Sequence, residues 1–324
     1  MDRWLQALGL IQPSARKWNV LTARKGGKQA LALRPESDLP HPTQNGSTAC
    51  YAGGMFEAHL TRWGLVPDGA PIATQAAHLL PVLKDGRPAM LKLSHEADER
   101  LGGVLMEWWG GDGAAQVIAR DGDALLMERA TGLGSLSDMA RHGQDDEACR
   151  ILCTAAARLH APRSKPLPEL TPLAEWFSDL WPVADRHGGI LARSADTARN
   201  LLAHQREVVA LHGDLHHGNV LDFGVRGWLA IDPKHLIGER GFDFANIFTN
   251  PDLADPARPV ATQPGCFARR LDIVTAASGL ERGRLLFWVL AWTGLSASWF
   301  LGDNDPLAEI DLRIAALAAA ELDR

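Results

Sequence analysis

The stretch His212-Gly213-Asp214-Leu215-His216-His217-Gly218-Asn219, taken together with Asp232, decides which fold this chain is expected to have. Asp214 precedes Asn219 by five positions, and Asp232 follows Asn219 by 13 positions. An aspartate at that interval before an asparagine is typical of a catalytic loop in which the carboxylate takes a proton and the asparagine binds a metal. Side-chain oxygens are suitable ligands for Mg²⁺. The spacing therefore predicts a catalytic base at Asp214 and metal ligands at Asn219 and Asp232.

A predicted hairpin returns Asp232 towards Asn219. Two short apolar runs, 219–221 and 227–231, flank a glycine-bearing turn, which is typical of a β-hairpin. Asn219 and Asp232 can then share one or two magnesium ions, whose charge offsets that of nucleotide phosphates during phosphoryl transfer. The triplet Asp222-Phe223-Gly224 imitates a kinase metal-binding motif. It lies in the turn, however, and the spacing favours Asp232.

A metal-dependent hydrolase is the alternative interpretation of the same stretch. Histidine and aspartate clusters form zinc or di-iron sites, and the loop offers four such side chains: His212, Asp214, His216 and His217. This alternative leaves Asn219 and Asp232 without a role, and no second histidine-rich cluster follows in the sequence. A kinase that acts on a small molecule explains more of the pattern.

A kinase also needs a lysine on a strand near its N-terminus to bind the nucleotide phosphates. Lys92 lies in an apolar run that follows a first apolar run across the turn Lys84-Asp85-Gly86, as in a β-hairpin. The next segment, 95–109, has apolar residues at helical spacing, with Glu96 and Glu99 in its first turns. Either glutamate could pair with Lys92, and we favour Glu99.

The apolar run 124–130 is the candidate for adenine recognition. It is followed by Thr131-Gly132-Leu133-Gly134, where the chain of a two-lobed kinase would pass from one lobe to the other. The edge of the adenine base meets backbone groups at that point, so the backbone from Glu128 to Ala130 is expected to bind it. The alternative is an ordinary strand end followed by a capped helix.

These segments resemble the aminoglycoside phosphotransferases, and within them the streptomycin and hydroxyurea kinase branch. The matching segments are Met90–Lys92, Trp109–Ala114, Leu125–Ala130, Leu211–Asn219 and Ala230–Lys234. The resemblance implies ATP and Mg²⁺ as cofactors and transfer to a hydroxyl of a small molecule. Asp214 would be the catalytic base, Asn219 and Asp232 the magnesium ligands, and Lys92 the phosphate-binding lysine.

Three further positions refine this resemblance. Asp243, in the segment Gly241–Asn246, matches a family residue that braces the fold behind the site, which implies a structural role. Leu101 stands at the helix position where the streptomycin branch has its glutamate, so the acceptor is left open between a streptomycin-type antibiotic and hydroxyurea. Gly213 stands where protein kinases have the arginine that senses a phosphorylated activation loop, so we expect constitutive activity.

The predicted fold class is α+β, with a two-lobed protein-kinase-like fold. The resemblance implies a small N-lobe (55–130) with an antiparallel sheet and one helix, and a larger, mostly helical C-lobe (131–324). Residues 1–54 contain seven Lys or Arg against three Asp or Glu and several prolines, and are predicted to be a loosely structured extension. The helices expected in the C-lobe are 148–160, 173–183, 194–209, 282–301 and a last one that opens at 305.

Composition limits the partners. A net charge of −6 and 46% hydrophobic residues suit a soluble globular protein, and the acidic balance favours a cationic small-molecule acceptor. We expect no nucleic-acid partner, and either a monomer or a homodimer. Segment 285–302 has no charged residue, but Thr293, Gly294 and two serines interrupt it, so a buried helix is favoured over a membrane span.

The four cysteines, Cys50, Cys149, Cys153 and Cys266, include no C-x-x-C pair and are expected to be reduced core residues in the cytoplasm. Two other functions compete with the antibiotic kinase. One is a kinase for an unrelated small metabolite. The other is a nucleotide-binding protein of kinase fold without turnover.

Overall fold

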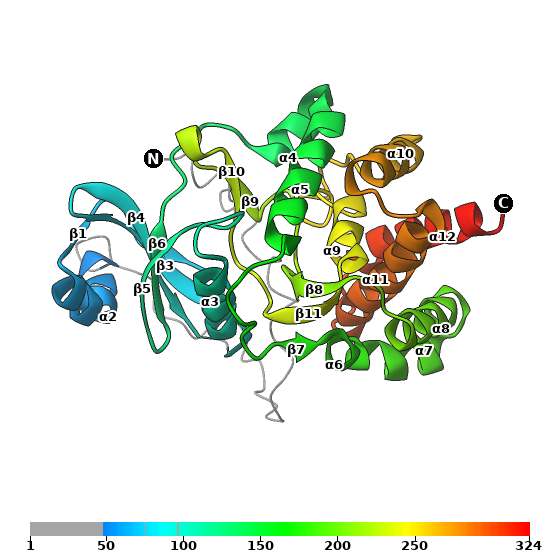
Figure 1. Ribbon diagram of the computed structural model, residues 1–324, viewed down its shortest axis with the longest axis horizontal. Coiled ribbons are helices and arrows are strands. Elements are labelled where there is room, and N and C mark those ends of the chain that lie inside the picture. Colours follow the sequence, from blue (N-terminus) through cyan, green and yellow to red (C-terminus); the bar gives the residue numbers. More distant parts are fainter. Residues whose placement is uncertain (1–47, 75, 96) are drawn as a thin grey trace, which may run out of the picture.

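A computed structural model of the chain describes residues 48–324, apart from residues 75 and 96. Figure 1 shows an antiparallel sheet at one end of the molecule and most of the helices at the other, with a two-stranded hairpin and the helix after the sheet's central strand lying towards the middle. This arrangement is the α+β fold with a kinase-like division that the sequence predicts. The boundary between the lobes at residues 130 and 131 stays a prediction.

The sheet has six strands in the order β1-β3-β4-β6-β5, with β2 beside β3. Their bounds are β1 (Leu65–Pro67), β2 (Ile72–Ala73), β3 (Ala77–Lys84), β4 (Arg87–Ser94), β5 (Val117–Asp121) and β6 (Ala124–Glu128). The predicted β3–β4 hairpin is present, because Lys84 faces Arg87 across Asp85 and Gly86. Both turn residues have positive φ angles, 51° and 74°, as a tight two-residue turn requires. Lys92 therefore lies on a central strand, between β3 and β6.

Helices cover both faces of this sheet. Side chains alternate along each strand, and one face packs against α2 (Thr48–Trp63) through Phe56. The other face packs against α3 (Ala97–Trp109) through Leu105 and Met106. The α2 helix was not predicted, and it begins before Met55. Residues 1–47 lie outside the described part of the chain, so the prediction of a loosely structured extension stays untested.

The other end of the molecule is mostly helical. Its helices are α4 (Leu136–Met139), α5 (Asp145–His160), α6 (Leu173–Trp176), α7 (Leu180–His187), α8 (Gly189–Ala203), α9 (Gly241–Ala245), α10 (Cys266–Ser278), α11 (Arg282–Gly302) and α12 (Ala308–Leu322). The prediction of one helix over 194–209 was wrong at its end. The chain breaks after Ala203, and Val208–Leu211 forms strand β8, which pairs with β11 (Leu236–Glu239). The two valines of β8 favour a strand. Strand β11 also pairs with β7 (Thr171–Pro172).

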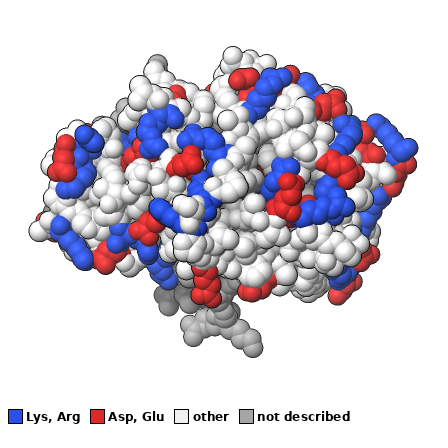
Figure 2. Space-filling model, viewed as in Figure 1, with Lys and Arg blue, Asp and Glu red and all other residues white. Residues whose placement is uncertain are grey.

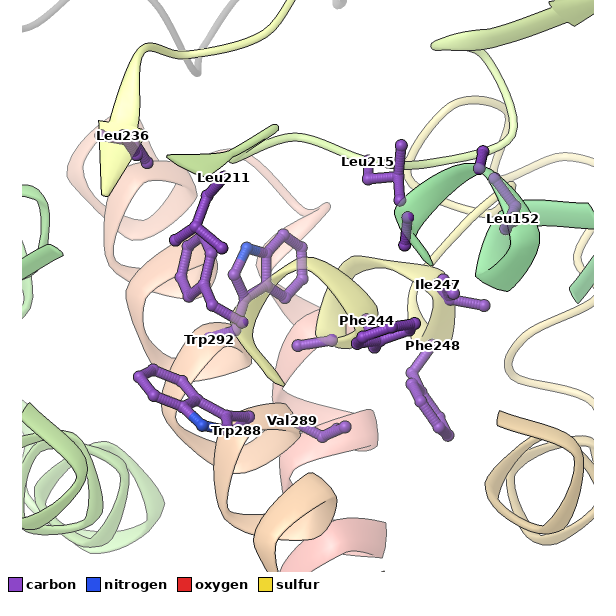
Figure 3. Packing of buried hydrophobic residues seen from close by; sticks show 14 of the residues in the cluster. Leu152, Leu211, Leu215, Leu236, Phe244, Ile247, Phe248, Trp288, Val289 and Trp292 are labelled. Atoms are coloured by element: carbon purple, nitrogen blue, oxygen red, sulfur yellow. The ribbon is translucent and has the colours of Figure 1, made fainter. Parts of the chain in front are cut away.

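The large hydrophobic core lies around α11. This helix of 21 residues is long and apolar enough to cross a membrane, since an 18-residue stretch of it has a mean hydropathy of 1.5. However, 78% of that stretch is buried inside the molecule. Figure 3 shows Trp288, Val289 and Trp292 of α11 packed beneath the strands that carry Leu211 and Leu236. The apolar segment is thus a core helix, as predicted. Cys149, Cys153 and Cys266 are buried free thiols, while the side chain of Cys50 lies outside the described residues.

Candidate active site

Asp214 lies in the loop between β8 and β9 (Val220–Asp222), and asparagine amides hold its carboxylate. The Nδ2 atom of Asn219 donates to the Asp214 carbonyl oxygen at 2.9 Å and to its Oδ2 atom at 3.3 Å. The Nδ2 atom of Asn246 donates to Oδ1 of Asp214 at 2.7 Å. Because the Nδ2 atom of Asn219 faces Asp214, its amide oxygen faces the other way and is available to a ligand.

The predicted hairpin is present and places Asp232 beside Asn219. Strand β9 pairs with β10 (Trp228–Ala230), and the amide of Ile231 donates to the carbonyl oxygen of Asn219 at 2.9 Å. Asp232 is the next residue. Its φ angle of 57° is in the left-handed region. Residues other than glycine seldom adopt this backbone conformation, and those that do are frequent at functional sites.

Lys92 joins this group from the sheet. Its Nζ atom lies 2.7 Å from Oδ1 of Asp232, 140 positions later in the chain, and only 4% of the Lys92 side chain is exposed. The predicted acidic partners of Lys92 cannot be compared with this contact. Glu96 and the side chain of Glu99 lie outside the described residues. Leu101, at the position where the streptomycin branch has its glutamate, is a substantially exposed residue of α3.

The helix α3 touches the residue that follows Asp232. A Cβ atom added to Gly102 would lie 2.3 Å from the carbonyl oxygen of Pro233. Two adjacent glycines, Gly102 and Gly103, stand inside α3, although each glycine in a helix interior costs about 1 kcal/mol relative to alanine. The close contact with Pro233 explains the first of them, because only glycine lets the two backbones approach this closely.

The Trp109–Ala114 motif makes a second junction between the sheet and the hairpin. Ala114 forms an isolated parallel bridge with Ala230. The amide of Ala230 donates to the carbonyl of Gly113, and the amide of Ala115 donates to the carbonyl of Ala230, both at 2.9 Å. The segment that leads to Asp232 is therefore hydrogen-bonded to the chain that connects α3 with β5.

The candidate adenine segment follows β6. Oε1 of Glu128 accepts a hydrogen bond from the amide of Gln116 at 2.6 Å and contacts Arg226, so its side chain is held within the protein. The amide of Arg129 donates to Pro88 at 3.4 Å. Among the described residues, the amide of the next residue, Ala130, donates to no backbone carbonyl. A backbone donor is thus present in the predicted segment.

Asp222, in the triplet that imitates a metal-binding motif, forms hydrogen bonds with backbone amides. Its two carboxylate oxygens accept hydrogen bonds from the amides of Gly134 and Gly224, at 3.0 and 2.9 Å. Its carbonyl accepts from the amide of Gly132 at 2.9 Å. Asp222 therefore braces the glycine-rich connection after β6.

Two histidines of the loop, His212 and His216, make hydrogen bonds within the protein, whereas the buried ring of His217 has no hydrogen-bond partner among the described residues. His212 is fully buried, its Nε2 atom bonds to the carbonyl of Ile231 at 2.8 Å, and its Nδ1 atom accepts from the amide of Asp214 at 3.2 Å. Burial lowers the pKa of His212, of His216 and, together with the charge of Arg270, of His217. Among the residues that the structure describes, no group of three or more His, Cys, Asp or Glu side chains is placed to hold a metal ion, which does not support the hydrolase alternative.

Asp243 of α9 braces the loop from behind. Its carboxylate accepts hydrogen bonds from the amides of His212 and Gly213, at 2.9 and 2.8 Å, and from Nε2 of His160 at 2.8 Å. Although burial opposes ionisation, these donors hold the pKa of Asp243 below its ordinary value. The geometry fits the structural role that the resemblance implies.

Asn246 was missed by the sequence reasoning, which quoted it in a matching segment but gave it no role. It follows Asp243 by three positions, across one helical turn, so both side chains face the same loop. Asp243 holds the backbone of the loop, and Asn246 holds the side chain of Asp214. The spacing within a helical turn was the available signal.

Comparison with known proteins agrees with this geometry. Residues 62–304 match the family model described as aminoglycoside/hydroxyurea antibiotic resistance kinase. Streptomycin 3''-kinase from Klebsiella pneumoniae is 57% identical over 267 residues, which cover 82% of this chain and 100% of the relative. Streptomycin 6-kinase from Streptomyces glaucescens is 31% identical over 289 residues, covering 82% and 88%.

A solved structure shows the same fold. It is a thermostable mutant of the aminoglycoside phosphotransferase APH(4)-Ia in a ternary complex with ADP and hygromycin B. The TM-score is 0.57 at 15% identity, and the match covers 81% of this chain and 97% of the other. At this identity the likeness concerns the fold alone.

Proposed function

This chain belongs to the aminoglycoside/hydroxyurea antibiotic resistance kinase family, and from that premise we propose that it transfers the γ-phosphoryl group of ATP to streptomycin. It is a phosphotransferase that modifies a hydroxyl group of a small-molecule antibiotic. The 57% identity with a streptomycin 3''-kinase, against 31% with a 6-kinase, favours the 3''-hydroxyl as the acceptor.

The observation that carries this proposal is the contact between Lys92 and Asp232 at 2.7 Å. This contact brings a cation from the sheet to a carboxylate whose preceding residue, Ile231, donates a backbone hydrogen bond to Asn219, at the end of the loop that contains the proposed base, Asp214. In the reaction, the acceptor oxygen bonds to the γ-phosphorus while the bond to the bridging oxygen of ADP breaks. The proton of the hydroxyl passes to the carboxylate of Asp214.

Asn219 and Asp232 are the proposed ligands of Mg²⁺. Both offer oxygen atoms, which suit a hard divalent cation, and the amide oxygen of Asn219 faces away from Asp214 because Nδ2 is bound there. The ion would offset the negative charge of the phosphates. Lys92, a compact point charge, would hold the same phosphates from the sheet side. The backbone from Glu128 to Ala130 would bind the adenine edge.

The overall charge of the chain bears on the choice of acceptor. The chain carries a net charge of −6, which suits a cationic antibiotic. Figure 2, however, shows acidic and basic side chains interspersed over the visible face, without a field of one sign. A cationic acceptor, a cytoplasmic location and a monomeric or homodimeric state remain predictions from the sequence.

A panel of acceptors tests the function. ATP consumption is measured with streptomycin, hydroxyurea, hygromycin B, choline and a simple sugar, and the product is located by phosphorus and proton NMR. We expect turnover with streptomycin and phosphate on its 3''-hydroxyl. Phosphate on the 6-hydroxyl would correct the position, and turnover of another compound would correct the substrate. ATP binding without consumption for any acceptor would favour a protein of kinase fold that has no turnover.

A further inference from the structure

The carboxylate of Asp214 depends on a residue outside its own loop. Its Oδ1 atom accepts a hydrogen bond from Nδ2 of Asn246 at 2.7 Å, whereas Oδ2 accepts from Asn219 at the longer distance of 3.3 Å. The main hydrogen bond of Asn219 goes to the carbonyl of Asp214 instead. Asn246 therefore provides the shorter of the two side-chain hydrogen bonds to this carboxylate, and Nε2 of His216 lies 3.7 Å from the same Oδ1 atom.

The amide of Asn246 is itself fixed from behind. Its Oδ1 atom accepts a hydrogen bond from Nδ2 of Asn250 at 2.8 Å, so its Nδ2 group must face Asp214. Asn246 and Asn250 are each 3% exposed. Since neither side chain can turn towards water without breaking a buried hydrogen bond, the donor that faces Asp214 is held in one orientation.

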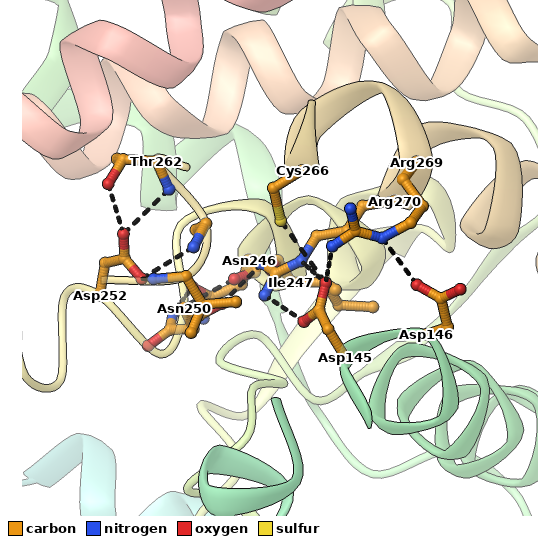
Figure 4. Close-up of polar contacts among 12 residues, drawn as sticks. Asp145, Asp146, Asn246, Ile247, Asn250, Asp252, Thr262, Cys266, Arg269 and Arg270 are labelled. Atoms are coloured by element: carbon orange, nitrogen blue, oxygen red, sulfur yellow. Dashed lines mark hydrogen bonds and ion pairs between the residues drawn. The ribbon is translucent and has the colours of Figure 1, made fainter. Parts of the chain in front are cut away.

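A buried ion pair anchors this arrangement, as Figure 4 shows. Nη1 of Arg270 donates to the carbonyls of Ile247 and Asn250 at 2.5 and 2.6 Å. The same guanidinium bonds to both carboxylate oxygens of Asp145, at 2.6 and 3.0 Å. The turn that carries Asn246 is thus fastened to α5 and α10, and a continuous chain of hydrogen bonds runs from Asp145 to Asp214.

We propose that Asn246 is a positioning residue for the reaction: it holds Oδ1 of Asp214 so that Oδ2 faces the acceptor hydroxyl. This inference rests on the proposed function, because it takes Asp214 as the base. An amide donor fixes the plane of the carboxylate, and it offers no charge that would compete with the incoming phosphates. Proton transfer needs such alignment, since a displacement of about 1 Å can cost on the order of a hundredfold in rate.

Two substitutions separate positioning from support of the fold. Asn246→Asp keeps the oxygen that accepts the hydrogen bond from Asn250. It replaces the amide group that donates to Asp214 with an oxygen of a second carboxylate. Two carboxylates at hydrogen-bond distance cannot both ionise readily, so the acidic limb of the kcat/KM profile should move up by about one pH unit or more. Asn246→Ala should lower kcat about tenfold to a hundredfold with nucleotide affinity within about twofold of the wild type.

Asp252→Asn is the matched control. Asp252 is fully buried in the same segment, but it binds the amides of Val260, Ala261 and Thr262 rather than Asp214. Its substitution should lower stability and leave the acidic limb of the pH profile in place. An unchanged acidic limb in Asn246→Asp, or a shift of the same size in Asp252→Asn, would overturn the inference.

A spectroscopic readout distinguishes this inference from the proposed function. The carboxyl ¹³C resonance of Asp214, assigned by its loss in Asp214→Asn, is titrated in the wild type and in Asn246→Asp. A rise of its pKa in Asn246→Asp supports the contact whether or not any acceptor is turned over. An unchanged titration overturns it even if streptomycin proves to be the substrate. Failure of the acceptor panel alone would instead reject the proposed function.

Discussion

Replacing Gly102 with alanine should move the proposed metal site without touching any residue in it. By helix propensity alone, the change would stabilise α3 by about 1 kcal/mol. The new Cβ atom, however, would lie 2.3 Å from the carbonyl oxygen of Pro233, where ordinary contacts begin at 3.4 Å. A backbone carbonyl cannot rotate aside as a side chain can, so α3 and the segment after Asp232 must separate by about 1 Å.

The consequence for activity follows from that displacement. Asp232 precedes Pro233 and contacts Lys92, so a shift of about 1 Å separates groups that must act together, at an expected cost of about a hundredfold in kcat/KM. Overpacking costs about 1–3 kcal/mol, which exceeds the propensity gain. We therefore expect the free energy of unfolding to fall by up to about 2 kcal/mol.

Gly103→Ala is the matched control, one position along the same helix. Its Cβ atom would meet Cδ of Arg120 at 3.1 Å and a Leu125 methyl at 3.4 Å, and these are side-chain atoms that can give way. This variant should keep wild-type kinetics and gain up to about 1 kcal/mol of stability. The assay compares kcat, KM and the affinity for magnesium and nucleotide in both variants. Wild-type values in Gly102→Ala would refute the reasoning.

Three further predictions concern single buried groups. Asp243→Asn should lower the free energy of unfolding by about 2–4 kcal/mol, measured in urea, because an amide replaces the ionised acceptor of two backbone amides and His160; an unchanged midpoint would contradict its bracing role. Burial raises the pKa of Asp311 well above its ordinary value, so the contribution of this carboxyl to stability is largest below its unfolded pKa and is lost as pH rises towards its folded pKa. Relative to the wild type, Asp311→Asn should therefore gain stability from about pH 4 upwards, and parallel profiles of stability against pH would disprove this. Burial also raises the pKa of the Cys149 thiol to about 12, so a thiol reagent at pH 8 should label it only after unfolding, as peptide mapping would show.

Local spacing was enough to predict that Asn219 would lie close to Asp214 and that the hairpin would return Asp232 towards Asn219. The five-residue interval from Asp214 to Asn219 closes a short loop, and the hairpin that follows returns the chain to Asn219 at Ile231, 12 positions later. Turn chemistry likewise predicted the β3–β4 hairpin that carries Lys92. Such features depend on neighbours in the sequence, and a single sequence contains that information.

Contacts between distant segments were not accessible in the same way. Gly102 and Pro233 meet only because α3 packs on the segment after the hairpin. Pro233 lies in a segment that matches the family, but nothing in that segment indicates Gly102 as its neighbour. Asn246 reaches Asp214 from the short 3-10 helix Asn246–Phe248 that follows α9. The sequence indicated the segment Gly241–Asn246 as a bracing segment without showing what each side chain would contact. The end of α8 was missed because the four residues of β8 obtain their strand partner from β11, far along the chain.

In the proposed reaction, Asp214 accepts the proton from the antibiotic at a site built with Asn219, Asp232 and Lys92. Single-turnover transfer from ATP to streptomycin, measured with saturating magnesium and nucleotide, tests it most directly in Asp214→Asn. We expect the variant to bind nucleotide but to transfer the phosphoryl group more slowly, by about a thousandfold or more. Transfer at the wild-type rate by Asp214→Asn would contradict the account.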